Sequence, residues 1–136
     1  MTTGRTCDAS ALVAVLVDGG AAGEWASGEL RTAGDIFAPH LALFEAANIL
    51  GRHELAKIIT ADQAAQAHAD ILELPLDLWP YELLAQRAWQ LRANLSVYDG
   101  AYVAVAELTD TTLVTLDARI ARAPNVRCTI ATPPEE

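Results

Sequence analysis

The chain has 136 residues, of which 52% are hydrophobic and 20% charged, a composition that excludes a disordered protein and favours one compact domain over residues 1–136. Its longest purely apolar run, residues 11–17, is too short to span a bilayer, and the N-terminal sequence lacks the order of regions found in a signal peptide, so we expect a cytoplasmic protein without a membrane partner. The net charge of -9 argues against binding of nucleic acid through basic side chains, although acids that hold divalent cations can meet phosphate through the metal.

The first forty residues predict two short strands separated by two helices. A strand ends at Cys7, and Asp8 then opens a sequence typical of a helix start before the apolar run. A second helix is expected over residues 21–31, and residues 35–39 form a short strand closed by proline. Asp8 therefore falls at the carboxyl end of a strand.

The middle of the chain predicts three helices and one strand. Apolar residues at helical intervals indicate a long helix over residues 40–59, and the spacing of a capping box begins another over residues 60–72. Alternating leucines over residues 74–78 fit a short strand, where a proline suggests an edge. A helix over residues 80–93 then starts at a proline.

The last third predicts two more helices and two more strands. A helix over residues 97–108 precedes the best strand of the sequence, residues 111–116, which is a continuous apolar and β-branched run. A short helix over residues 118–123 and a strand over residues 126–131 follow, and residues 131–136 form a loose tail. Because strands alternate with helices, we expect the α/β class, with a central parallel sheet and helices on both faces.

Four acids stand in apolar surroundings, namely Asp8, Glu45, Asp99 and Asp117. Asp8 and Asp117 end predicted strands, where α/β folds bind ligands, and the other two enter from helices. Two like charges about 4 Å apart repel by roughly 4 kcal/mol at an effective dielectric constant near 20, so such a cluster recruits cations, protonates or splays. Three of the acids could instead cap helices, but Glu45 lies inside a helix, where no cap explains it.

The residue types around these acids indicate the metal and its chemistry. Oxygen ligands without histidine or cysteine favour Mg²⁺ or Mn²⁺, which can activate water against a phosphodiester. Asn48 follows Glu45 by about one turn and is expected to face the same pocket. Arg119 is expected either to hold a phosphate or to tie a carboxylate. Arg52 and its basic neighbours near a helix end are interpreted as solvated surface, with RNA or the helix dipole as the alternative contacts.

Four segments together resemble the PIN domain, in particular the VapC-type toxins of bacterial toxin–antitoxin pairs. They are CDASALVAVL, HLALFEAANIL, LSVYDGAYVAVAE and LVTLDARIAR. The resemblance covers essentially the whole chain and keeps the order of the family's motifs. It implies a small endoribonuclease with a parallel sheet, an acidic Mg²⁺ or Mn²⁺ site, an RNA substrate, and a cognate antitoxin that blocks the site. It also implies a homodimer and a toxin–antitoxin hetero-oligomer.

The resemblance assigns roles to residues by position. Asp8, Asp99 and Asp117 match acids that hold the metal, and Glu45 matches an acid that ligates the metal or positions the attacking water, so all four are predicted to be catalytic. Two polar residues, Ser10 and Thr115, match positions that support such a site through hydrogen bonds. The family commonly has alanine where this chain has Gly100, a change expected to loosen the helix carrying Asp99.

Three other functions are weaker interpretations of the same sequence. A non-catalytic PIN-fold module that binds RNA or protein is the main alternative, but such a protein is expected to have lost one of the acids. A phosphoaspartate receiver domain needs a late lysine, and Lys57 is the only lysine here. A haloacid-dehalogenase-like phosphatase needs an aspartate where Ser10 stands.

The two cysteines, Cys7 and Cys128, are interpreted as reduced thiols. They fall on the first and last predicted strands. In the family's sheet order another strand separates these two, which puts them roughly 9 to 10 Å apart, too far for a disulfide.

Overall fold

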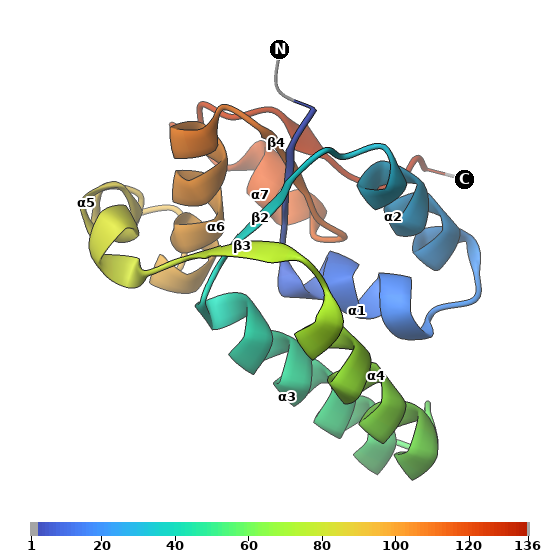
Figure 1. Cartoon of the computed structure of the whole chain (residues 1–136). Helices are drawn as coiled ribbons and strands as arrows, with labels where there is room; N and C mark the ends of the chain where they lie inside the picture. Colours follow the sequence, from blue (N-terminus) through green and yellow to red (C-terminus); the bar gives the residue numbers. More distant parts are fainter. Residues whose placement is uncertain (1–2, 136) are drawn as a thin grey trace.

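Over residues 3–135, which the computed structural model describes, five strands form one parallel sheet and seven helices surround it (Figure 1). The strands are β1 (Arg5–Cys7), β2 (Ile36–Pro39), β3 (Leu76–Trp79), β4 (Thr112–Val114) and β5 (Ile130–Ala131). The helices are α1 (Ala9–Val17), α2 (Ala21–Arg31), α3 (Leu41–Leu55), α4 (Ala61–Glu73), α5 (Tyr81–Gln90), α6 (Val97–Thr109) and α7 (Ala118–Arg122).

The strand order β3-β2-β1-β4-β5 makes the chain change direction across the sheet between β1 and β4. These two strands are neighbours in register, with Cys7 beside Val114. In Figure 1, α5 and α6 lie to the left of the strands and α1 and α2 to the right. The predicted α/β fold is therefore confirmed, and the carboxyl ends of β1 and β4 form the switch point where such sheets bind ligands.

The core is built around α6, whose residues 100–106 are all buried. Leu12 of α1 and the β4 side chains Leu113 and Val114 are likewise withdrawn from solvent. Many of the buried positions carry alanine, which lets helices approach one another closely. Within residues 3–135, every helix is too short or too polar to cross a lipid bilayer.

The last predicted strand is much shorter than expected, because long-range contacts hold the backbone before it. Asn125 adopts a left-handed φ of 70°, and its carbonyl accepts a hydrogen bond from Arg87 at 2.5 Å. The Arg127 N–H donates to the Glu107 carboxylate at 2.8 Å. Strand geometry therefore starts only at Ile130.

Both cysteines are free thiols, as predicted. Cys128 was expected on a strand and instead precedes β5. Strand β4 does lie between β1 and β5. Of the predicted tail, Ala131 belongs to β5, residues 132–135 have no regular secondary structure, and residue 136 lies outside the described residues.

Helix α3 also ends earlier than predicted, at Leu55. Lys57 has a left-handed φ of 61°. The N–H of Ile58 donates to the His53 carbonyl at 2.9 Å, and that of Lys57 to the Glu54 carbonyl at 3.0 Å, which is the pattern of a Schellman cap. The predicted capping box of the next helix is present, with Thr60 as its N-cap.

Candidate metal centre

The four predicted acids line one pocket of about 220 Å³ at the carboxyl ends of the strands. Asp8 directly follows β1, and Asp117 comes three residues after β4. Glu45 enters from the second turn of α3 and Asp99 from the first turn of α6. The remaining polar lining is Ser10, Asn48, Arg52 and Tyr102.

Asp8 is the most deeply buried of these acids, with 7% of its surface exposed. Its Oδ1 accepts hydrogen bonds from the Ser10 hydroxyl at 2.6 Å and the Ala11 N–H at 3.0 Å, and its Oδ2 accepts one from Thr115. Burial raises the pKa of Asp8 in spite of these three bonds, and the nearby charge of Asp99 raises it further. A bound cation would relieve this cost of ionisation.

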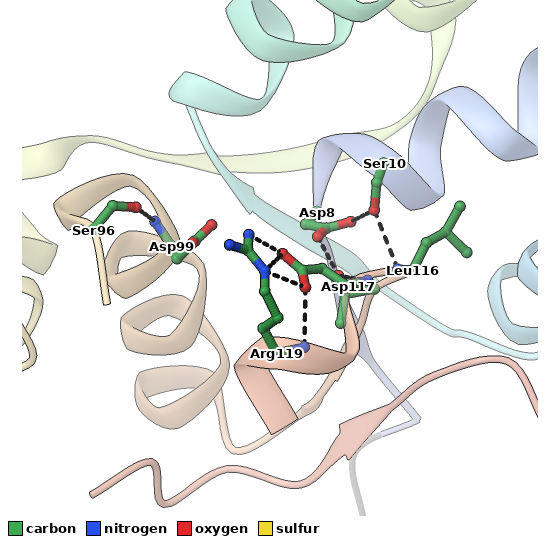
Figure 2. Close-up of polar contacts among 8 residues, drawn as sticks. Asp8, Ser10, Ser96, Asp99, Leu116, Asp117 and Arg119 are labelled. Atoms are coloured by element: carbon green, nitrogen blue, oxygen red, sulfur yellow. Dashed lines mark hydrogen bonds and ion pairs between the residues drawn. The ribbon is translucent and has the colours of Figure 1, made fainter. Parts of the chain in front are cut away.

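The two predicted supporting hydroxyls join the start of α1 to the loop after β4. Ser10 Oγ also accepts the Leu116 N–H at 3.1 Å (Figure 2), and Thr115 Oγ1 accepts the Asp117 N–H at 2.9 Å. Each hydroxyl therefore donates to Asp8 and receives a backbone hydrogen bond. This arrangement fixes the distance between the segments that carry Asp8 and Asp117.

Asp99 is the third residue of α6, whose N-cap is Ser96. The Ser96 hydroxyl accepts the Asp99 N–H at 3.1 Å, so the alternative interpretation of Asp99 as a helix cap is wrong. Burial raises the pKa of Asp99, and so does the charge of Asp117. In Figure 2 its side chain points toward the Arg119 guanidinium.

Asp117 caps α7 and is held by a guanidinium. Arg119 Nε lies 3.0 Å from Oδ1 and Nη2 lies 2.6 Å from Oδ2 (Figure 2). These bonds hold the pKa of Asp117 below its usual value. Of the two contacts expected for Arg119, the structure contains the one with a carboxylate.

Glu45 is held by a residue that the sequence did not indicate. The Tyr102 hydroxyl donates to Glu45 Oε1 at 2.6 Å, although Tyr102 is only 2% exposed. Burial, together with this bond, raises the pKa of Tyr102, so the hydroxyl keeps its proton and acts as a donor. The sequence feature that could have pointed to Tyr102 is its position three residues after Asp99, on the same side of the helix.

Asn48 and Arg52 extend the pocket along α3 beyond Glu45. Both are exposed. Arg52 was interpreted as solvated surface and is indeed exposed, but it also lines the pocket. Its position seven residues after Glu45, almost two helical turns, was the available signal.

The donor set fits a hard divalent cation. The pocket offers four carboxylates and an amide, and no histidine or cysteine from the described range contributes to it. Across residues 3–135, no three acidic, histidine or cysteine side chains yet stand close enough to hold one ion. Because Arg119 bonds to both oxygens of Asp117, a cation bound to that carboxylate would compete with the charge of the guanidinium.

Sequence comparisons match the chain to one family of proteins. The family model of the PIN domain matches residues 6–126. Ribonuclease VapC9 of Mycobacterium tuberculosis is 35% identical over 127 residues, covering 93% of this chain and 96% of that protein. Ribonuclease VapC1 of the same species is 38% identical over 125 residues, covering 90% and 92%.

Solved structures share the fold at lower identity. The structure of Mycobacterium tuberculosis VapC20, described as a sarcin-ricin loop cleaving toxin, has a TM-score of 0.67 at 18% identity, covering 87% of this chain and 93% of that one. A member of the VapBC family of toxin–antitoxin systems, VapBC-5 from the same species, has a TM-score of 0.60 at 17% identity, covering 96% and 97%.

Proposed function

This chain belongs to the PIN-domain family and, within it, to the VapC ribonucleases, and from that premise we propose that its ribonuclease site is the pocket lined by Asp8, Glu45, Asp99 and Asp117. The named relatives are VapC ribonucleases, and solved structures with this fold include a toxin and a member of a toxin–antitoxin family. The chain is accordingly an endoribonuclease toxin that hydrolyses RNA phosphodiester bonds. The observation that carries the assignment of the site is that four carboxylates from four separate elements line one pocket at the switch point of the sheet.

Divalent metal is general for this family, and the oxygen donors favour Mg²⁺ or Mn²⁺ as the ion. When bound, the ion polarises the phosphodiester and lowers the pKa of a water. In the proposal Asp8, Asp99 and Asp117 hold the ion. Glu45, aligned by Tyr102, ligates the ion or accepts a proton from the attacking water.

Cleavage assays with substituted acids test this assignment. Cleavage of total bacterial RNA should require Mg²⁺ or Mn²⁺ and stop in EDTA. Asp8→Asn and Asp99→Asn should each lower the rate by about 100-fold or more, because each removes a charged oxygen from the ion. Gel electrophoresis of the products measures both effects.

Asp77→Asn provides a matched control, since Asp77 is an exposed acid on β3 outside the pocket. It changes the net charge equally and should leave the rate unchanged. Cleavage that persists in EDTA, or full activity in both pocket variants, would contradict the proposal. An intact fold that binds RNA without cutting it would instead favour the non-catalytic alternative.

The partner proposal is a cognate antitoxin, as in the toxin–antitoxin system to which VapBC-5 belongs. Exposed apolar side chains on and after α3, and on α4, support a protein contact; they are Leu55, Ile58 and Leu72. Co-purification with the product of the adjacent reading frame, and relief of growth arrest by it, would test the pairing. A homodimer and a cytoplasmic location are proposed from the family alone.

A further inference from the structure

Arg52 lies in one row with two other pocket residues on α3. Glu45, Asn48 and Arg52 are spaced by three and four positions, which puts them on the same side of the helix, and all three line the pocket. Long side chains on a helix lean toward its N-terminus, so the Arg52 guanidinium leans toward Asn48. We propose that Arg52 binds an RNA phosphate next to the scissile one.

Arg52 forms no ion pair within the described residues. The ion pairs found among residues 3–135 engage the guanidinium groups of Arg5, Arg87 and Arg119. Arg52 is in none of them and is exposed to solvent. Its guanidinium can therefore bind an anion from outside without breaking an existing contact.

The acids of the pocket do not compete for Arg52, because other donors hold three of them. Asp117 is paired with Arg119, Glu45 accepts the Tyr102 hydroxyl, and the Asp8 carboxylate is surrounded by its own donors. A planar guanidinium offers two parallel N–H groups that match a phosphate. In a chain of net charge -9, a free cation at the rim of an acidic pocket supplies local attraction for the backbone of RNA.

The distance along α3 between Arg52 and Glu45 makes a role for Arg52 in substrate binding, and not in the chemical step, the expected one. Seven residues of α-helix span about 10 Å, so the backbone of Arg52 lies about two turns from that of Glu45. A guanidinium that leans toward Asn48 then meets the phosphate next to the one that the carboxylates would hold. A contact with a neighbouring phosphate strengthens substrate binding and leaves the reacting atoms untouched. The inference rests on the proposed function and predicts an effect on KM with little effect on kcat.

The test compares Arg52→Gln with Arg31→Gln. Arg31 is exposed and lies in the last turn of α2, as Arg52 lies in the last turn of α3, so both variants lose the same charge and the same interaction with a helix dipole. With total bacterial RNA and Mn²⁺, Arg52→Gln should raise KM about tenfold, as expected for one charge-assisted contact. Its kcat should stay within about twofold, and Arg31→Gln should change neither constant.

The salt dependence gives a second readout. Removing one phosphate contact should lower the slope of log KM against log salt concentration by about one in Arg52→Gln alone. Equal KM values in the two variants, or a loss in kcat only, would overturn the inference. If the wild-type chain cuts no RNA, the proposed function fails by itself. Anisotropy of a fluorescent random 20-nucleotide RNA in Mn²⁺ then decides the role of Arg52, with equal affinities overturning it.

Discussion

The carboxylates of the pocket differ in the groups that hold them. Asp8 Oδ2 and Glu45 Oε1 each accept a hydrogen bond from a hydroxyl, and this bond can persist when the second lone pair of the oxygen meets a cation. Asp117 is instead held at both oxygens by Arg119. The guanidinium acts as an internal counter-ion for Asp117, and a metal held by Asp117 would compete with it.

The Tyr102 hydroxyl leads to a prediction about Glu45. Tyr102→Phe removes the donor at 2.6 Å from Oε1 and leaves the buried ring in place. We expect kcat to fall about tenfold, because a hydrogen bond to a charged group contributes roughly 1.5–3 kcal/mol and here orients the carboxylate. Steady-state cleavage kinetics at several Mn²⁺ concentrations measure the change.

Those kinetics also separate the two roles open to Glu45. If Glu45 ligates the ion, the half-saturating Mn²⁺ concentration should rise in Tyr102→Phe. If Glu45 positions the water, only kcat should fall. Tyr98→Phe is the matched control, since Tyr98 lies on the same helix with 61% of its surface exposed. Indistinguishable kinetics of the two variants would refute a role for the Tyr102 hydroxyl.

The sequence indicated the acids but not the groups that hold them. Asp8 and Asp117 do cap helices and also line the pocket, so the two interpretations were compatible. Tyr102 follows Asp99 by about one helical turn, but this spacing did not assign it to the site, because an aromatic residue inside an apolar helix usually belongs to the core. Only the approach of α3 to α6 reveals that its hydroxyl meets Glu45.

At the scale of elements, one glycine sets how α2 meets the end of α1. A Cβ added at Gly23 would stand 1.8 Å from the Asp18 carbonyl oxygen and 2.9 Å from that of Ala14. Because both atoms belong to the backbone, no side chain can move aside. We predict that Gly23→Ala lowers the free energy of unfolding by about 3 kcal/mol or prevents folding, as overpacking does in tight cores.

Gly28 supplies the control on the same helix. A Cβ there would meet only the end of the Arg31 side chain, 3.9 Å away. Gly28→Ala should therefore raise the free energy of unfolding by up to about 1 kcal/mol through helix propensity. Urea unfolding followed by circular dichroism measures both variants. Equal effects of the two substitutions would show that the close approach at Gly23 does not matter.

Helices and strands that depend on local sequence signals were predicted more accurately than those that depend on contacts with residues distant in sequence. Helices were predicted well, since their periodicity and the capping box at Thr60 are local signals. The end of α3 was missed because Lys57 takes a left-handed conformation that usually calls for glycine. The last strand was overextended because Glu107 and Arg87, distant in sequence, hold residues 125–127.

At the scale of the whole molecule, the acidic pocket opposes the stability of the metal-free fold. Burial raises the pKa of both Asp8 and Asp99, so keeping these groups ionised costs free energy in the folded state. Arg119 offsets part of the charge at Asp117. The fold thus holds four carboxylates around one pocket at the switch point, where a cation would stabilise both the site and the protein.

This conflict predicts opposite effects of one substitution in two conditions. Without divalent metal, Asp99→Asn should raise the free energy of unfolding by on the order of 1 kcal/mol, since it removes a half-buried charge whose repulsion is partly screened by water. In the wild type, Mn²⁺ at a hundred times its dissociation constant should add about 2.7 kcal/mol. Asp99→Asn should lose most of that gain, and Asp77→Asn should behave as the wild type does. Thermal unfolding in EDTA measures the stability of each variant without metal. Repeating it in Mn²⁺ gives the gain in stability for the wild type, Asp99→Asn and Asp77→Asn. An equal Mn²⁺ gain in Asp99→Asn and the wild type would show that Asp99 holds no ion, because losing a ligand weakens ion binding and so lowers the gain.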